Sequence, residues 1–334
     1  MVTGYDVARL AGVSQSAVSL ALRDSTRISP ETKKRILDAV EALGYTPSQV
    51  GRSLATRRTG RIGVVTGELL NPFYPALLAP LHDALMASGN CTVLLTTSAD
   101  GSDEKTDLAP IFDGSLDGVV LTALTVSSPL PGALTRAGIP FVFLNREVDG
   151  DDADSCVPDD DGGVQTVVRE LVSLGHRRFG MISGPMDVST ARARRASFVR
   201  HLADHEIALP DDRIVVGSFT HEAGQQGLRQ LLGGPHPPTA VFCANDVIAL
   251  GALDAAAADG IDVPGDVSLV GFDDIAPAAW SVFDLTTVRV DLAAMAAGAA
   301  ELLVRRIRDK DAAPERRVVA TTLARRRTHA AVRT

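Results

Sequence analysis

Residues 5–22, YDVARLAGVSQSAVSLAL, predict two short helices joined by a tight turn. Apolar residues recur at helical spacing over residues 5–11, which predicts a first amphipathic helix. Gly12 permits a turn with positive φ, and Ser14 is a favourable N-cap for a second helix over residues 15–22. This pattern is typical of a helix-turn-helix, whose second helix enters the major groove of DNA, although a helical hairpin in any small bundle has the same pattern.

A third helix and a basic linker follow this hairpin. Ser29 is placed to cap a helix that begins at Pro30 and ends at Gly44. Its expected apolar stripe comprises Ile36, Leu37, Val40 and Leu43. Three short helices bury little apolar surface, so a headpiece of this size is marginally stable alone. Residues 47–60 are polar and basic, and we expect this hinge to form a turn or two of helix only with DNA or with a second copy.

Charge is distributed unevenly along the chain. The net charge is −8, yet residues 1–61 carry ten basic and five acidic residues, whereas residues 62–334 carry 23 basic and 36 acidic residues. A basic head on an acidic body suits a protein that contacts phosphate groups at one end only. An uneven solvated surface without a partner is the simpler alternative.

Composition and length exclude several classes of protein. The 334 residues include 45% hydrophobic and 22% charged residues, which is ordinary for a globular protein with sizeable cores. No apolar run is long enough to span a membrane and no signal peptide is evident, so we expect a cytoplasmic protein without membrane contact. Cys91, Cys156 and Cys243 lack metal-ligand spacing and are expected to be small buried side chains. We therefore expect no metal site.

From residue 61 onward, strands and helices alternate. This alternation predicts parallel sheets with helices on both faces, in two similar series of about 100 residues each. Expected strands are residues 62–66, 92–96, 118–121, 141–144, 179–182, 214–216, 240–243, 268–271, 286–288 and 317–321. Expected helices are residues 75–88, 104–112, 131–137, 163–174, 191–205, 222–232, 247–258 and 291–307. We expect residues 324–334 to be irregular and basic.

Several long motifs, in order, resemble the lactose/galactose-repressor family of bacterial transcription regulators. The headpiece and hinge carry YDVARLAGVSQSAVSLAL, ISPETKKRILDAVEALGYTPS and RSLA. The body carries IGVVTGELLNPFYPALL, LVSLGHRRFGMISGP, PTAVFCANDVIALGALDA, VPGDVSLVGFDD and LTTVRVD. The resemblance covers about residues 4–328, which makes it far more specific than a helix-turn-helix pattern alone.

The resemblance implies an all-α helix-turn-helix headpiece and an α/β core of two doubly wound parallel-sheet lobes, like a periplasmic binding protein. The implied parts are a headpiece over residues 1–46, a hinge over 47–60 and a core over 61–330, whose lobes are about 61–159 with 291–318 and about 160–288 with 319–330. Three strands would cross between the lobes. A small-molecule effector would bind in the cleft between them, beyond the carboxyl ends of the strands.

For DNA, the resemblance implies base contacts by the second helix and a wedge from the hinge. The base-reading positions are Gln15, Ser16, Ala17 and Leu20, of which Gln pairs well with adenine. The expected phosphate contacts are Thr3, Tyr5, Ser14, Ser19 and Arg23. Leu54, with its neighbours Arg52, Ser53 and Ala55, matches the hinge segment that enters the minor groove and kinks the duplex. Gly51 replaces the usual alanine, so this hinge is expected to order less readily.

For the effector, the resemblance implies a polar cleft with one aromatic face. The expected ligand contacts are Asn71, Asp161, Arg194, Phe219, Asn245 and Asp273, a mix of donors, acceptors and a ring that suits a carbohydrate. Asn71 is also placed to cap the helix at Pro72, and Asp246 is expected to cap the next helix rather than to touch ligand. Gly67, Val290 and Leu292 differ from relatives on one wall, so the effector's identity does not transfer.

Two other classes of function are weaker. A transporter's solute-binding protein would need an export signal and no basic headpiece. A nucleotide-dependent enzyme is disfavoured because the chain lacks GxGxxG, a P-loop and GxSxG. His176 follows a helix and is interpreted as a C-terminal cap rather than a ligand. The sequence therefore predicts a homodimeric, effector-controlled repressor that binds a palindromic operator, with no catalytic residue and no cofactor.

Overall fold

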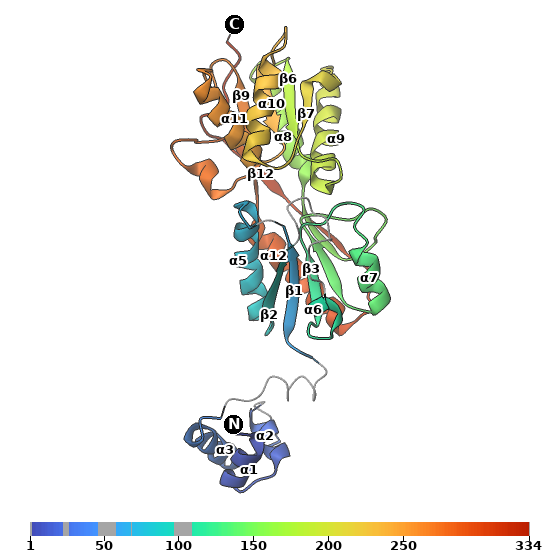
Figure 1. Cartoon of the computed structure of the whole chain (residues 1–334), viewed down its shortest axis with the longest axis vertical. Helices are drawn as coiled ribbons and strands as arrows, with labels where there is room; N and C mark the ends of the chain where they lie inside the picture. The colour runs from blue at the N-terminus through green and yellow to red at the C-terminus, as the bar shows by residue number, and fades with distance from the viewer. Residues whose placement is uncertain (1, 23–26, 46–57, 68, 97–108, 334) are drawn as a thin grey trace. The chain divides into compact units, whose positions relative to one another are not determined.

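The computed structural model describes residues 2–22, 27–45, 58–67, 69–96 and 109–333 (Figure 1). The chain divides into two compact units, Met1–Gly60 and Arg61–Thr334. The first unit holds three helices, α1 (Gly4–Ala11), α2 (Gln15–Leu22) and α3 (Pro30–Ala42). The predicted fold class, a helical headpiece followed by an α/β core, is confirmed.

Local side-chain chemistry sets the ends of the headpiece helices. Thr3 and Asp6 form a capping box at the start of α1, and Gly12 ends that helix with φ of 64°. The Ser14 hydroxyl accepts from the backbone N–H of Ala17 at 3.2 Å, as expected of an N-cap. Ser29 caps α3 in the same way, by accepting from the backbone N–H of Thr32. The predicted helix boundaries therefore agree with the structure.

The headpiece core is small, as its length predicts. Its buried residues are Val7, Ala8, Val18, Ala21, Ile36 and Ala39. The expectation for Leu37 is wrong, because its side chain is 44% exposed. The buried stripe of α3 instead follows the spacing of Ile36, Ala39, Val40 and Leu43, which lie on one helical face.

The second unit contains two six-stranded sheets. The first has the order β11-β5-β4-β3-β1-β2, with bounds β1 (Arg61–Thr66), β2 (Cys91–Thr96), β3 (Gly118–Leu121), β4 (Phe141–Leu144), β5 (Ser155–Pro158) and β11 (Arg316–Val319). The second has the order β12-β10-β9-β8-β6-β7, with bounds β6 (Phe179–Ser183), β7 (Ile214–Val216), β8 (Ala240–Cys243), β9 (Ser268–Asp273), β10 (Thr287–Val290) and β12 (Thr321–Ala324). All pairs are parallel except β10 with β12. The short strand β5 was not predicted.

Helices cover both sheets (Figure 1). The first sheet carries α5 (Phe73–Ala87), α6 (Ala109–Phe112), α7 (Leu130–Ala137) and α12 (Leu292–Arg308). The second carries α8 (Asp160–Ser173), α9 (Ser189–Ala203), α10 (His221–Leu232) and α11 (Asp246–Ala258), with short 3-10 turns η2 (Asp211–Arg213) and η3 (Ala276–Ala279). Right-handed crossovers place α8 and α9 on one face of this sheet and α10 and α11 on the other.

Two glycines let α10 and α11 approach closely. A Cβ at Gly224 would lie 2.0 Å from the carbonyl oxygen of Ile248, and one at Gly251 would lie 1.9 Å from that of His221. Any side chain at either position would force the helices apart. This packing fixes the starts of α10 and α11, which follow Phe219 and Asn245, two of the predicted ligand residues.

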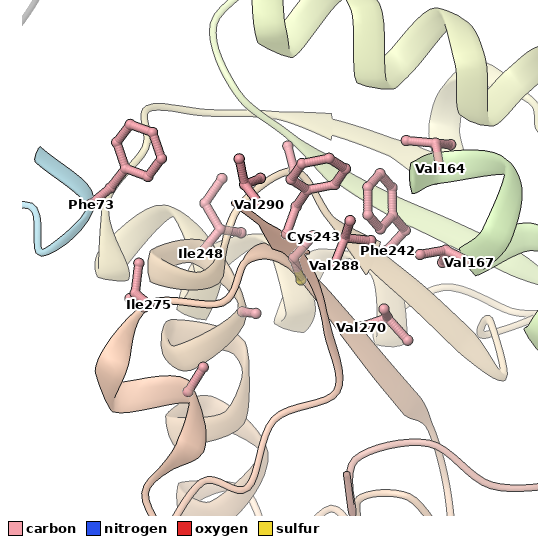
Figure 2. Close-up of a cluster of buried hydrophobic side chains, with 14 of the residues drawn as sticks. Phe73, Val164, Val167, Phe242, Cys243, Ile248, Val270, Ile275, Val288 and Val290 are labelled. Atoms are coloured by element: carbon pink, nitrogen blue, oxygen red, sulfur yellow. The ribbon is translucent and has the colours of Figure 1, made fainter. Parts of the chain in front are cut away.

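The buried apolar cluster is continuous through both sheets. It includes Phe242 of β8, which Figure 2 shows near Val164 and Val167 of α8. It also includes Phe73 of α5 and Val290 of β10, which belong to elements of different sheets. The chain passes between the sheets three times, at residues 158–160, 290–292 and 319–321. Two of these crossings are joined, since Asp159 N–H donates to the Val319 carbonyl and the Thr321 hydroxyl donates to the Asp159 carbonyl.

Residues 325–333 form no helix or strand, as predicted, but they are packed on the second sheet. His176 is buried, with its ring nitrogens 2.9 Å from the Thr239 hydroxyl and 2.9 Å from the Ala330 carbonyl oxygen. Its interpretation as a helix cap is therefore wrong: burial lowers its pKa and its contacts fasten the tail. Cys156 and Cys243 are buried as expected, but Cys91 is exposed because it begins the edge strand β2. Over the described ranges, no helix is both long and apolar enough to cross a membrane.

We expect Glu170→Gln to destabilise the tail against α8. Arg325 donates two hydrogen bonds to Glu170, at 2.8 and 2.7 Å, and together with His329 lowers the Glu170 pKa from 4.5 to about 2. A pKa lowered by folding stabilises the fold above pH 4.5, and this contribution is lost as the pH falls toward 2. The free energy of unfolding should fall by about 1–2 kcal/mol at pH 7, since exposure of Arg325 screens the pair.

Urea unfolding of the purified protein between pH 3 and pH 7 measures this effect. Glu206→Gln, at an exposed residue after α9, is the matched control and should have little effect. A difference between Glu170→Gln and the unmodified protein that stays constant as the pH falls would contradict the assignment.

Candidate functional site

A small pocket lies where the carboxyl ends of strands from both sheets meet. Its lining comprises Asn71, Phe73, Tyr74, Asn145, Arg146, Thr190, Arg194, Phe219, Asn245 and Asp273. Five of the six predicted effector residues are therefore brought together here. The placement follows the rule that ligands of open α/β sheets bind beyond the carboxyl ends of strands.

Arg194 of α9 is the centre of the polar wall. Its side chain is 3% exposed, with the guanidinium 2.7 Å from an Asp160 oxygen, 3.2 Å from an Asp273 oxygen and 2.7 Å from the Ala244 carbonyl oxygen. The guanidinium also stacks 3.7 Å from the centroid of the Phe272 ring. These contacts engage Nε and Nη1 of Arg194 within the protein, so Arg194 orders the polar wall as well as lining the pocket.

Burial disfavours the charged form of both carboxylates that contact Arg194. Burial raises the pKa of Asp273 to about 6, although the charge of Arg194 opposes this rise. Burial likewise raises the pKa of Asp160, again against the attraction of Arg194. Asp273 has φ of 115°, a backbone conformation that is costly for a residue with a side chain. The end of β9 is therefore held in a shape that directs this carboxylate toward the pocket.

Asn245, rather than Asp246 as the sequence suggests, caps α11. The Asn245 side-chain oxygen accepts from the Ile248 N–H at 3.0 Å, so Asn245 caps α11 while lining the pocket. Asp246 does not cap the helix: its buried carboxylate accepts hydrogen bonds from the Thr287 hydroxyl and, at 2.9 Å, from the Ile275 N–H. Burial and the nearby charge of Asp273 raise the Asp246 pKa well above its ordinary value.

Phe219 and Arg146 face each other across the pocket. The Arg146 guanidinium carbon lies 5.6 Å from the centroid of the Phe219 ring. Gly184 makes room for that ring, because a Cβ there would lie 2.4 Å from it. Sequence reasoning missed Arg146 altogether. Its position directly after Asn145, beyond the carboxyl end of β4, is the signal that could have identified it.

The Tyr74 ring occupies the side of the pocket that the first sheet contributes. A Cβ at Gly67 would lie 2.8 Å from the Tyr74 ring, so the space that Gly67 leaves is occupied by this ring rather than by ligand. Burial raises the Tyr74 pKa, which keeps its hydroxyl protonated. Asn71 has both expected features: it lines the pocket, and its side-chain oxygen accepts from the Phe73 N–H at 3.1 Å at the start of α5.

Asp161 lies outside the pocket lining, contrary to expectation. Its carboxylate pairs with Arg200 and His201 on the outer part of α9. The preceding residue, Asp160, reaches Arg194 instead. Successive residues of a helix are about 100° apart, so a shift of one position exchanges a buried direction for an exposed one.

Contacts at the rim join the two sheets beside the pocket. Val126 N–H donates to the Asp187 carbonyl at 2.7 Å, and Glu147 N–H donates to the Ser189 hydroxyl at 3.0 Å. Asp149, which follows β4, forms an ion pair with Arg192 of α9. The segment after β4 therefore contacts both the ligand pocket and the opposite sheet.

The headpiece presents a polar surface on α2. Ser14, Gln15, Ser16 and Ser19 are exposed, whereas Ala17 and Leu20 are half-buried. Tyr5 is 67% exposed, but the Thr3 hydroxyl already takes part in the capping box of α1. Among the other DNA residues expected from sequence, Arg23, Arg52, Ser53, Leu54 and Ala55 lie outside the described residues.

Comparison with known proteins identifies both units. Residues 3–48 match the lacI family of bacterial regulatory proteins, and residues 168–329 match a periplasmic binding protein-like domain. A relative described as a probable HTH-type transcriptional repressor, ExuR of Bacillus subtilis (strain 168), is 32% identical over 294 residues, which cover 86% of each chain.

Two solved structures are similar over nearly the whole chain. A complex of the transcriptional regulator CelR with cellobiose has a TM-score of 0.75 and 31% identity, covering 98% of this chain and 100% of that one. A lac repressor dimer bound to operator and the anti-inducer ONPF has a TM-score of 0.87 and 26% identity, covering 99% of both chains.

Arg194→Met should destabilise the second unit strongly, because it leaves two buried carboxylates without their cation. The expected loss in the free energy of unfolding is about 3–5 kcal/mol at pH 7. The loss should shrink as the pH falls, because Asp160 and Asp273 then become protonated. Urea unfolding measures it, with Arg195→Met on the same helix as control; that side chain contacts the exposed Asp211, at 3.5 Å, and the Met186 sulfur, at 3.2 Å, but no buried carboxylate within the described residues. Equal effects of the two substitutions would contradict the role assigned to Arg194.

Proposed function

The chain belongs to the LacI family of bacterial regulatory proteins, and on this premise we propose that it is a repressor controlled by a sugar. The observation that carries the proposal is the presence, in one chain, of an exposed α2 surface and a polar pocket between two sheets. The first suits DNA recognition in the major groove, and the second suits a small hydroxylated ligand. No catalytic step is part of this function.

In the proposed DNA complex, α2 reads bases and the linker reads the minor groove. Gln15 and Ser16 offer side-chain amide and hydroxyl groups to base edges, while Tyr5, Ser14 and Ser19 are positioned for phosphate contacts. Leu54, outside the described residues, is proposed as the apolar wedge at the operator centre, flanked by Arg52. Two copies would read the two halves of a palindrome.

An exposed apolar surface on the second unit suits the contact between copies. Trp280 is 58% exposed and Val282 is 73% exposed, and Trp280 stacks on Phe283 with ring centroids 6.5 Å apart. Val282 and Phe283 line a groove together with Leu253 of α11. We propose that a second copy of this chain covers this surface, as the lac repressor dimer on its operator suggests for a protein of the same fold.

Val282→Asp should convert the dimer to a monomer, because a carboxylate would be buried in the proposed interface. Sedimentation of the full chain at micromolar concentration measures this, and Val216→Asp, another exposed valine, is the control. Affinity for a duplex selected from random sequences should fall with the loss of the dimer, and the selected site should be an inverted repeat. A dimeric Val282→Asp variant, or selection of an asymmetric site, would count against the proposal.

Asp273→Ala should weaken effector binding while leaving DNA binding intact. A sugar identified by thermal shift from a panel of monosaccharides and disaccharides should lose about 1–3 kcal/mol of binding free energy, since its hydroxyl loses a buried acceptor. Calorimetry measures this loss, and circular dichroism checks folding. Asp161→Ala is the matched control, because Asp161 lies outside the pocket. The cleft assignment fails if Asp273→Ala keeps full affinity.

A further inference from the structure

Arg146 is a pocket residue with a buried donor that the protein does not use. Its Nε atom is buried and lacks a hydrogen-bond partner within the described ranges. In that same part of the chain its guanidinium forms no ion pair, and its closest recorded neighbour is the Phe219 ring at 5.6 Å. A guanidinium is always charged and carries five donors, so leaving it unpaired in a partly buried site is unfavourable.

Several acceptors near Arg146 are engaged by other groups. Asp160 and Asp273 face Arg194, at 2.7 and 3.2 Å. The side-chain oxygens of Asn71 and Asn245 accept from backbone N–H groups. A ligand acceptor in the pocket would therefore satisfy the Arg146 donor.

We propose that the effector is a monosaccharide acid whose carboxylate is bound by Arg146, with the sugar ring against Phe219 and its hydroxyls toward Asp273. This inference rests on the proposed function and narrows its ligand. A planar carboxylate matches the guanidinium fork and supplies two acceptors with one negative charge. A phosphate would bring more negative charge beside Asp160 and Asp273, which disfavours it.

A ligand contact at Arg146 would affect the segment that joins the two sheets. Arg146 lies between Asn145, which has φ of 73°, and Glu147, whose N–H donates to the Ser189 hydroxyl of α9. Asp149, three residues on, pairs with Arg192 of the same helix. A ligand held by Arg146 and Asp273 therefore acts on the segment that already joins the two sheets.

Calorimetry on the full chain tests the inference with matched probes. The acids are D-galacturonate, D-glucuronate and D-gluconate, the neutral sugars are D-galactose and D-glucose, and D-glucose 6-phosphate supplies the phosphate. At least one acid should bind at least tenfold more tightly than its neutral parent, and Arg146→Gln should remove this preference. Arg229→Gln, which removes an arginine that lies outside the pocket and pairs with Asp259, should retain it.

The possible outcomes separate the inference from the proposed function. The inference is overturned if no acid binds, if the phosphate or a neutral sugar binds more tightly, or if Arg146→Gln keeps the preference for an acid. Binding of a neutral sugar that is lost in Asp273→Ala would retain the proposed function and reject the acid. Binding of every probe unchanged by Asp273→Ala would reject the cleft itself.

Discussion

The buried cluster around Arg194 is the interaction on which the ligand pocket depends. One guanidinium joins α9, the start of α8 through Asp160, the end of β9 through Asp273, and the end of β8 through the Ala244 carbonyl. Each carboxylate alone would be costly to bury, as their raised pKa values indicate. Together with the cation they hold the carboxyl ends of two strands and two helix termini in one arrangement.

The pocket therefore has two unlike sides: the side from the second sheet is rigid, and the side from the first sheet can move when a ligand binds. The wall from the second sheet is fixed by Arg194, by the Asn245 cap and by the close packing of α10 on α11. The wall from the first sheet contributes Arg146 and Tyr74, and it meets the second at rim contacts such as Asp149 with Arg192. A ligand that binds both walls has different affinities for different lobe arrangements, which is the physical requirement for control of a distant DNA site.

Features governed by local chemistry were predictable from the sequence, whereas features governed by tertiary packing were not. Gly12, Ser14 and Ser29 set helix ends through contacts within a few residues, so the headpiece helices were predicted closely. Alternating apolar runs likewise predicted the α/β core. Asp161 was assigned from the family resemblance, and sequence alone does not show which residue of α8 faces α9. The His176 ring contacts the Ala330 carbonyl oxygen, 154 residues away along the chain. The Arg146 Nε lacks a hydrogen-bond partner within the described residues. Local sequence patterns indicate neither feature.

The central claim is that occupation of the pocket changes the affinity of the headpiece for DNA. Fluorescence anisotropy of a labelled, selected inverted-repeat duplex measures this directly, with and without saturating ligand at fixed ionic strength. A coupling free energy of about 1–3 kcal/mol predicts a change in operator affinity of roughly 5- to 150-fold, and no change for a scrambled duplex. Operator affinity that is identical with and without a ligand shown to occupy the pocket would contradict the account.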